Sequence, residues 1–180
     1  MWPISTKAQI HSKNLRTIEL SMGLMDKLSF KKDDNVGIWL NFIFSKYNAR
    51  KGGFRYGINL QQKYYETPVK RLINVNQYFV ETGYGFELIK SKKRRLFLNG
   101  VGGLVAGYES INGEKKEVDA LFVVQNESKI LAGTYFLVEF EAILSTKTSL
   151  IINTRQIWTP TSNLQDFHSR VGIGLRLNYF

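Results

Sequence analysis

The sequence predicts an all-β fold, namely an eight-stranded antiparallel up-and-down transmembrane β-barrel with a polar interior that side chains fill. Three observations lead to this prediction. Apolar residues recur at every second position along most of the 180-residue chain, which is the period of a strand with one apolar face. The connections between these segments alternate between short and long. No window approaches about 18 consecutive apolar residues, which excludes a transmembrane helix but leaves membrane-spanning strands open.

The first half of the chain holds four such segments. Because successive side chains of a strand point to opposite faces, Thr17, Glu19 and Ser21 fall on the polar face of the first segment. Each segment is about ten residues long, which is enough for a tilted strand to cross a bilayer. The four apolar faces are Ile18, Leu20, Met22 and Leu24; Val36, Ile38, Leu40, Phe42 and Phe44; Phe54, Tyr56, Ile58 and Leu60; and Tyr78, Val80, Thr82, Tyr84, Phe86 and Leu88.

The second half of the chain holds four more segments. The fifth, over residues 96–108, is rich in glycine, and its pattern does not decide which face is apolar. The last segment alternates most regularly, and we expect it to be the C-terminal strand through which the barrel is assembled. The other three apolar faces are Ile130, Ala132, Thr134, Phe136, Val138 and Phe140; Leu150, Ile152 and Thr154; and Val171, Ile173, Leu175, Leu177 and Tyr179.

The connections predict the orientation of the barrel. Short turns at one end and longer loops at the other are typical of an outer-membrane barrel with both termini in the periplasm. Residues 1–8 end in a small residue and are too short for a secretory signal, so they are either the remnant of a signal peptide or a frayed start of a cytosolic protein. Residues 9–180 then form one β-barrel domain. The short connections are 47–53, 90–94 and 145–148, and the long ones are 26–35, 66–74, 110–127 and 160–166.

Charged residues of both signs occur on the polar faces of the segments. In a membrane barrel they would form a buried ion-pair network, whereas in a soluble lipocalin-like barrel they would form the solvated outer face. Aromatic residues near the segment ends favour the membrane barrel, while Trp39, on the polar face of its segment, argues against it. The candidate interior network is Glu19, Arg55, Glu81, Glu87, Glu109, Glu139, Glu141, Arg155, Arg170 and Arg176.

The net charge of +10 at pH 7 predicts an anionic partner such as nucleic acid or a lipid surface. No nucleic-acid fold signature accompanies the basic residues, so we expect them to lie in periplasmic turns beside anionic lipid headgroups, without direct contact to nucleic acid. The absence of cysteine excludes disulfides, thiolate zinc sites and a cysteine nucleophile. The basic turn residues are Arg50, Lys51, Lys90, Lys92, Lys93, Arg94, Arg95 and Lys147.

Asp166, His168 and Ser169 are the one group of residues that suggests catalysis. In a regular strand Asp166 and His168 point to one side and Ser169 to the other, which is a poor arrangement for a nucleophile and its base. We therefore expect no catalytic residues, no metal site and no cofactor.

Three motifs lie in order in the second half of the chain. Residues 105–112 read Val-Ala-Gly-Tyr-Glu-Ser-Ile-Asn, Glu141, Arg155 and Trp158 lie in the expected penultimate hairpin, and residues 171–179 form the last segment. These motifs resemble those of the TraO family of conjugative transposons, which has a Gly-Tyr-Glu-Thr-Ile-Asn signature, a similar penultimate hairpin and a similar C-terminal motif, with Phe180 one residue extra here. The resemblance implies an outer-membrane component of a Gram-negative DNA-transfer apparatus, with no established catalytic residue to carry over.

Together these observations predict a non-enzymatic anchor or docking element of the outer membrane rather than a pore. Its expected partners are outer-membrane lipids, other proteins of the transfer machinery and the barrel-assembly machinery. Two alternatives stay open, a soluble lipocalin-like ligand-binding barrel and a small outer-membrane lipid-modifying enzyme.

Overall fold

The structure is a computed structural model of the chain. It describes residues 15–26, 36–48, 52–66, 72–92, 95–111, 117–119, 122–123, 129–162 and 165–179. The two strands over residues 117–119 and 122–123 are described by their backbone alone. Residues 1–8, considered above as a signal-peptide remnant, lie outside the described residues.

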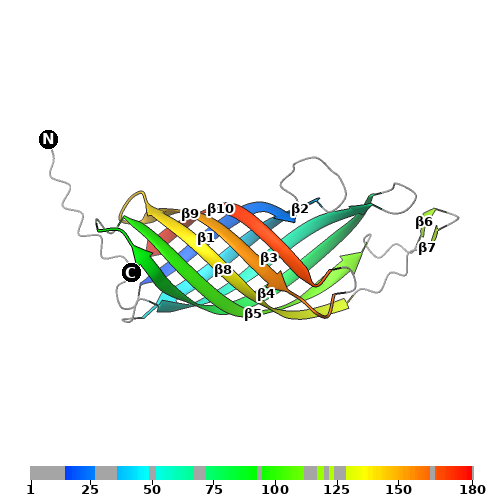
Figure 1. Cartoon of the computed structure of the whole chain (residues 1–180), viewed down its shortest axis with the longest axis horizontal. Helices are drawn as coiled ribbons and strands as arrows, with labels where there is room; N and C mark the ends of the chain where they lie inside the picture. The colour runs from blue at the N-terminus through cyan, green and yellow to red at the C-terminus, as the bar shows by residue number, and fades with distance from the viewer. Residues whose placement is uncertain are drawn as a thin grey trace.

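The chain forms a closed antiparallel barrel with the strand order β1-β10-β9-β8-β5-β4-β3-β2 (Figure 1). The pairing of β1 with β10, from Arg16 opposite Tyr179 to Met25 opposite Arg170, closes the ring. This confirms the predicted eight-stranded antiparallel barrel. Its strands are β1 (Arg16–Asp26), β2 (Val36–Tyr47), β3 (Gly52–Glu66), β4 (Leu72–Lys90), β5 (Leu96–Ile111), β8 (Lys129–Ile143), β9 (Thr148–Trp158) and β10 (Phe167–Tyr179). The hairpin of β6 (Glu117–Asp119) and β7 (Phe122–Val123) belongs to the connection between β5 and β8.

The strands are longer than the ten residues that alternation predicts. β4 has 19 residues, β5 has 16 and the shortest barrel strands have 11. Part of the difference lies where β3 ends and β4 begins, because Leu72 pairs with Glu66 and the predicted 66–74 loop is therefore shorter. Hydropathy marks only the part of a strand that contacts lipid, so backbone pairing beyond that belt is not visible in the sequence.

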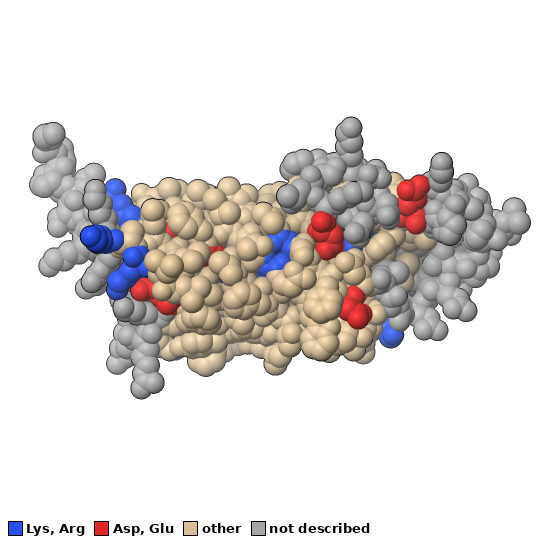
Figure 2. Space-filling view, viewed as in Figure 1, with Lys and Arg blue, Asp and Glu red and all other residues tan. Residues whose placement is uncertain are grey.

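An apolar belt covers the outside of the barrel. Leu20, Phe42 and Ile58 are each about half exposed, and every second residue of all the barrel strands follows them outward. Figure 2 shows a mostly tan surface across this belt, with a small blue area near its middle and a group of Lys and Arg side chains at one end. Charged side chains lie inside the barrel and apolar ones outside, which is the reverse of a soluble barrel.

The two ends of the barrel differ. At one end, the turn end, β2, β4 and β8 end and β3, β5 and β9 begin, with the first residue of β1 and the last of β10 beside them. At the opposite end, the loop end, β1, β3, β5 and β9 end, the bounds of the strands leave longer connections, and the β6–β7 hairpin lies beyond the barrel (Figure 1). The predicted alternation of short and long connections is therefore present. Among the residues that the structure describes, none belongs to a helix that could span a bilayer.

The fifth strand, whose apolar face the sequence left open, has apolar residues on both sides. Leu104 and Tyr108 point outward, whereas Val101 and Val105 are buried inside. The two valines belong to an apolar cluster on the inner wall, which alternation alone did not predict. Its members are Phe79, Val101, Val105, Leu131, Tyr135, Leu137 and Ile157.

Trp39 points into the barrel, where the sequence placed it and where a large ring seemed out of place. Its side chain is 5% exposed, and its indole Nε1 donates a hydrogen bond to the carbonyl oxygen of Leu24 at 3.1 Å. Room for the ring comes from Gly172 of β10, because a Cβ at that position would lie 2.2 Å from Cζ2 of Trp39. The glycines of the inner face thus make space for the large side chains that face them.

We expect Gly172→Ala to destabilise the barrel by about 1–3 kcal/mol, because the added methyl group overpacks the site. A Cβ there would also lie 2.5 Å from the carbonyl oxygen of Met22. Gly102→Ala is the matched control, since its Cβ would meet nothing within 4 Å. Urea unfolding of the refolded barrel measures both variants, and equal stabilities would contradict the fit between Gly172 and Trp39.

Candidate functional site in the barrel interior

The interior near the turn end holds a cluster of five charged residues. Arg176 of β10 is its centre and contacts three glutamates. Its Nη2 atom lies 2.6 Å from Oε2 of Glu19 and 2.6 Å from Oε1 of Glu139, and its Nη1 atom lies 2.8 Å from Oε2 of Glu141. Arg55 of β3 completes the cluster, with contacts of 3.1 Å to Glu19 and 2.8 Å to Glu139. We call these five residues the arginine–glutamate cluster.

The arginine–glutamate cluster is fully desolvated. Each member is at most 3% exposed, and Asn99 donates further hydrogen bonds to Glu139 at 3.1 Å and to Glu141 at 3.3 Å. Buried charges are tolerated only when paired and hydrogen-bonded, and both guanidinium groups meet that condition with short contacts. The members come from β1, β3, β8 and β10, so the cluster joins strands on different sides of the ring.

A second ion pair joins Arg155 of β9 to Glu81 of β4. Its contacts are Nη1–Oε2 at 2.6 Å and Nη2–Oε1 at 3.0 Å, so both oxygens of the carboxylate are used. The guanidinium also lies over the ring of Tyr135, 4.4 Å from its centroid. Two parallel hydrogen bonds and a cation–π contact fix the orientation of Arg155 across the lumen.

Three of the ten predicted network residues lie apart from these arginine–carboxylate contacts. Arg170 donates to the side-chain oxygens of Asn59, at 2.9 Å, and Gln61, and no described carboxylate lies within ion-pair distance of it. Glu109 accepts hydrogen bonds from Gln77 at 2.5 Å and from Ser162.

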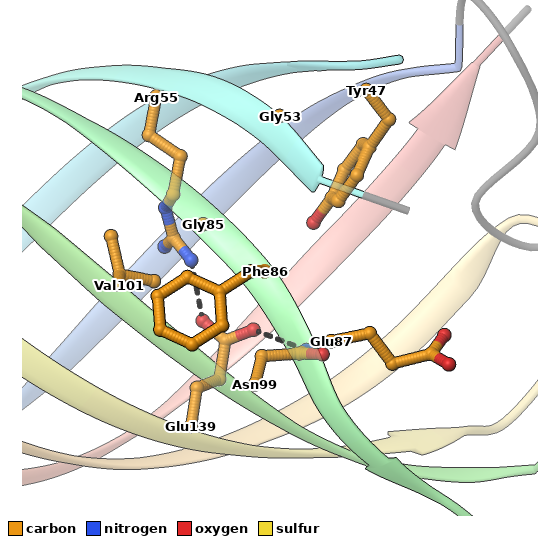
Figure 3. A pocket seen from close by; sticks show the side chains of 9 residues that line it. All are labelled: Tyr47, Gly53, Arg55, Gly85, Phe86, Glu87, Asn99, Val101 and Glu139. Atoms are coloured by element: carbon orange, nitrogen blue, oxygen red, sulfur yellow. Dashed lines mark hydrogen bonds and ion pairs between the residues drawn. The ribbon is translucent and has the colours of Figure 1, made fainter. Parts of the chain in front are cut away.

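Glu87 is the third residue that lies apart. Its carboxylate is 3.7 Å from Nζ of Lys90 and points away from Glu139, as Figure 3 shows. The ten residues therefore do not form one continuous network. A pattern of alternating faces decides which side a residue occupies, but not how far along the barrel axis it lies.

The loop end holds a polar group that sequence reasoning missed. Lys63 contacts Asp26 and Gln165, and Nδ1 of His168 lies 3.2 Å from Oδ2 of Asp26. Alternation predicts an outward side chain for Asp26, but its φ of 61° places it in the left-handed region, where the strand pattern ends. The inward position of Lys63 could have been predicted by continuing the alternation beyond Leu60.

The three residues considered for catalysis do not come together. His168 is buried and directed to Asp26, whereas Ser169 is exposed and its hydroxyl donates to Gln156 at 2.8 Å. Asp166 is exposed and accepts a hydrogen bond from Thr159 through its backbone carbonyl. The nucleophile and the base thus lie on opposite faces of β10, as period-two geometry predicts.

Four of the predicted basic turn residues are described by the structure. Lys90, Lys92, Arg95 and Lys147 lie exposed at the turn end. The other four, Arg50, Lys51, Lys93 and Arg94, lie outside the described residues. On the last strand, Val171, Ile173, Leu175, Leu177 and Tyr179 all point outward between β1 and β9.

An internal cavity lies beside the arginine–glutamate cluster (Figure 3). Its volume is about 10 Å³, and Arg55, Asn99 and Glu139 are among its lining residues. That volume is about the room that one water molecule needs. In the described part of the interior, charged side chains, amide side chains and the apolar cluster occupy the space between the strands.

The comparison with solved structures finds eight-stranded barrels of outer-membrane proteins. Ail of Yersinia pestis shares 14% identity at a TM-score of 0.57, with 93% of this chain and 99% of that chain covered. Neisserial surface protein A shares 8% at 0.65, with 92% and 96% covered. OprG of Pseudomonas aeruginosa shares 9% at 0.56, with 94% and 99% covered. The TM-scores show a common fold, and at such low identities the likeness shows the fold alone.

A family comparison identifies the chain more closely. No curated protein matches it. The sequence model of the family described as conjugative transposon protein TraO matches residues 13–179. That range contains the whole barrel from Arg16 to Tyr179 and extends the resemblance, which residues 96–180 carried, to the first half of the chain. This chain therefore belongs to the TraO family of conjugative transposon proteins.

Proposed function

We propose that this protein is a non-enzymatic outer-membrane component of a conjugative DNA-transfer apparatus, acting as an anchor or docking element and not as a pore. The family match supports the role in conjugation, and the outward apolar belt supports a membrane position. In this proposal the turn end and both termini face the periplasm. The partners are outer-membrane lipids, the barrel-assembly machinery and other proteins of the transfer machinery, and the protein makes no direct contact with DNA.

One observation carries the proposal that the barrel does not conduct DNA. Arg176 of β10 and Arg55 of β3 share Glu19 of β1 and Glu139 of β8, so charged side chains from four strands meet within the lumen. An eight-stranded barrel has an interior just wide enough for its own side chains. Opening a path for a DNA strand would require separating all of these buried ion pairs.

The first test is electrical. In a planar lipid bilayer, the purified and refolded barrel is expected to give no sustained single-channel conductance, because the described interior is filled. Steady openings of the size that porins give would contradict the anchor proposal and favour a conducting barrel.

The second test is genetic. Deleting the gene is expected to lower the frequency of conjugative transfer strongly, and the wild-type gene in trans is expected to restore it. Restoration by His168→Ala would separate the structural role from an enzymatic one, because a lipid-modifying enzyme would need that base. Wild-type transfer frequency in the deletion strain would contradict a role in the apparatus.

A further inference from the structure

Two cations face each other across neighbouring strands on the outer surface. Arg16 of β1 is directly opposite Lys46 of β2, and both side chains are exposed. The neighbouring pair on the same face is Ile18 opposite Phe44, at the edge of the apolar belt. Side chains directly opposite in an antiparallel pair have Cβ atoms about 4.5–5.5 Å apart, and like charges at that distance destabilise the sheet.

Among the described residues, no negative charge compensates this pair. In the described ranges, neither Arg16 nor Lys46 forms an ion pair or a hydrogen bond through its side chain. At the same end, Glu19, Glu139 and Glu141 point inward and are engaged by Arg55 and Arg176, and Glu87 lies beside Lys90. The described residues therefore leave the pair available to an anion from the surroundings of the barrel.

Aromatic residues flank the two cations on both sides. Along the outer surface, Arg16 pairs with Tyr179 of β10, and Lys46 pairs with Phe54 of β3. The ring of Tyr179 lies 6.4 Å from that of Phe44, measured between centroids. Aromatic residues at the edge of an apolar belt mark the level of lipid headgroups, where amphipathic rings are favoured. The row Phe54–Lys46–Arg16–Tyr179 thus lies where the phosphates of a bilayer lie.

We propose that Arg16 and Lys46 together bind the phosphate group of an anionic phospholipid in the leaflet that meets the turn end. The guanidinium offers parallel N–H donors to two phosphate oxygens, and the ammonium adds a point charge. Ile18 and Phe44, the next pair into the belt, contact the first carbons of the acyl chains. This inference rests on the membrane position in the proposed function, but not on the role in conjugation.

The test is a double-mutant cycle in two lipid mixtures. Arg16→Gln, Lys46→Gln and the double variant are reconstituted in vesicles of phosphatidylcholine, with and without phosphatidylglycerol, and thermal unfolding is followed by gel mobility. Each single variant is expected to lose about 2–4 °C of the stabilisation that the anionic lipid gives the wild type. Because one phosphate needs both cations, the double variant is expected to lose little more than either single variant.

The matched control is Lys92→Gln, which removes a charge from a turn at the same end. Combined with Arg16→Gln, it is expected to give additive losses, because Lys92 lies in the turn between β4 and β5 and not opposite Arg16. Additive losses for Arg16 and Lys46 would overturn the shared site in favour of diffuse surface attraction. Inorganic phosphate added to pure phosphatidylcholine vesicles is expected to stabilise nothing, and an equal effect of free phosphate would also overturn a lipid site.

A charge reversal gives a second readout that folding defects cannot imitate. Lys46→Glu converts the like-charged pair into Arg16 opposite glutamate, so it is expected to be at least as stable as the wild type in phosphatidylcholine alone. The same variant is expected to lose its response to phosphatidylglycerol. A retained response would overturn the proposal, and neither result depends on the frequency of conjugation, so this inference and the proposed function can fail separately.

Discussion

Arg176→Leu is expected to be the most damaging single substitution in this barrel, with a loss of about 3–5 kcal/mol or failure to fold. The leucine leaves Glu19, Glu139 and Glu141 buried with Arg55 as their remaining cation in the cluster. An uncompensated buried carboxylate costs far more than the ion pair itself contributes, because it has lost its hydration. The fraction of folded protein after refolding into detergent or vesicles, and its unfolding in urea, measure the effect.

Arg95→Leu is the control for this substitution. It makes the same chemical change at an exposed position of the turn end and is expected to alter stability by less than about 0.5 kcal/mol. If Arg176→Leu folded as well as Arg95→Leu, the arginine–glutamate cluster would have no role in folding. Adding Glu139→Gln to Arg176→Leu is expected to restore part of the stability, since one fewer buried charge is left without a partner.

Arg155→Leu is expected to impair folding by a similar amount through a different contact. The bidentate pair with Glu81 is buried, and the substitution leaves that carboxylate without its guanidinium. The double variant Arg155→Leu/Glu81→Leu is expected to be more stable than Arg155→Leu alone, because replacing a whole buried pair by apolar groups is often neutral. Urea unfolding of Arg155→Leu, Glu81→Leu and the double variant measures the coupling. A double variant less stable than Arg155→Leu would show that Glu81 has another role.

The strands could be predicted from the sequence because lipid imposes a strict rule on one face. On β10, for example, Arg170, Gly172, Arg176 and Asn178 alternate with apolar residues, and the structure places the two sets on opposite faces. The rule fails where both faces are apolar. On β5, Val101 and Val105 face an apolar inner wall, and hydropathy does not distinguish that wall from lipid.

The interior contacts could not be predicted, because they depend on the tilt and stagger of the strands. Arg55 and Glu139 are 84 positions apart in the chain and meet across the lumen. Alternation correctly places both side chains inside. It also predicts the same interior position for Glu109 and Glu141, although only Glu141 contacts an arginine. Asp26 shows a further limit, since one residue with a positive φ reverses the direction of its side chain.

The strand pair that closes the barrel, β1 with β10, contains an ion pair that depends on the register of the two strands. Glu19 of β1 is directly opposite Arg176 of β10, in the pair of strands that joins the two ends of the sheet. Sliding β10 by one residue would turn Arg176 toward the lipid, and sliding it by two would place it opposite Thr17 or Ser21. Only one of these alignments of the first and last strands pairs the two charges. The Glu19–Arg176 ion pair therefore favours the native register when the ring closes.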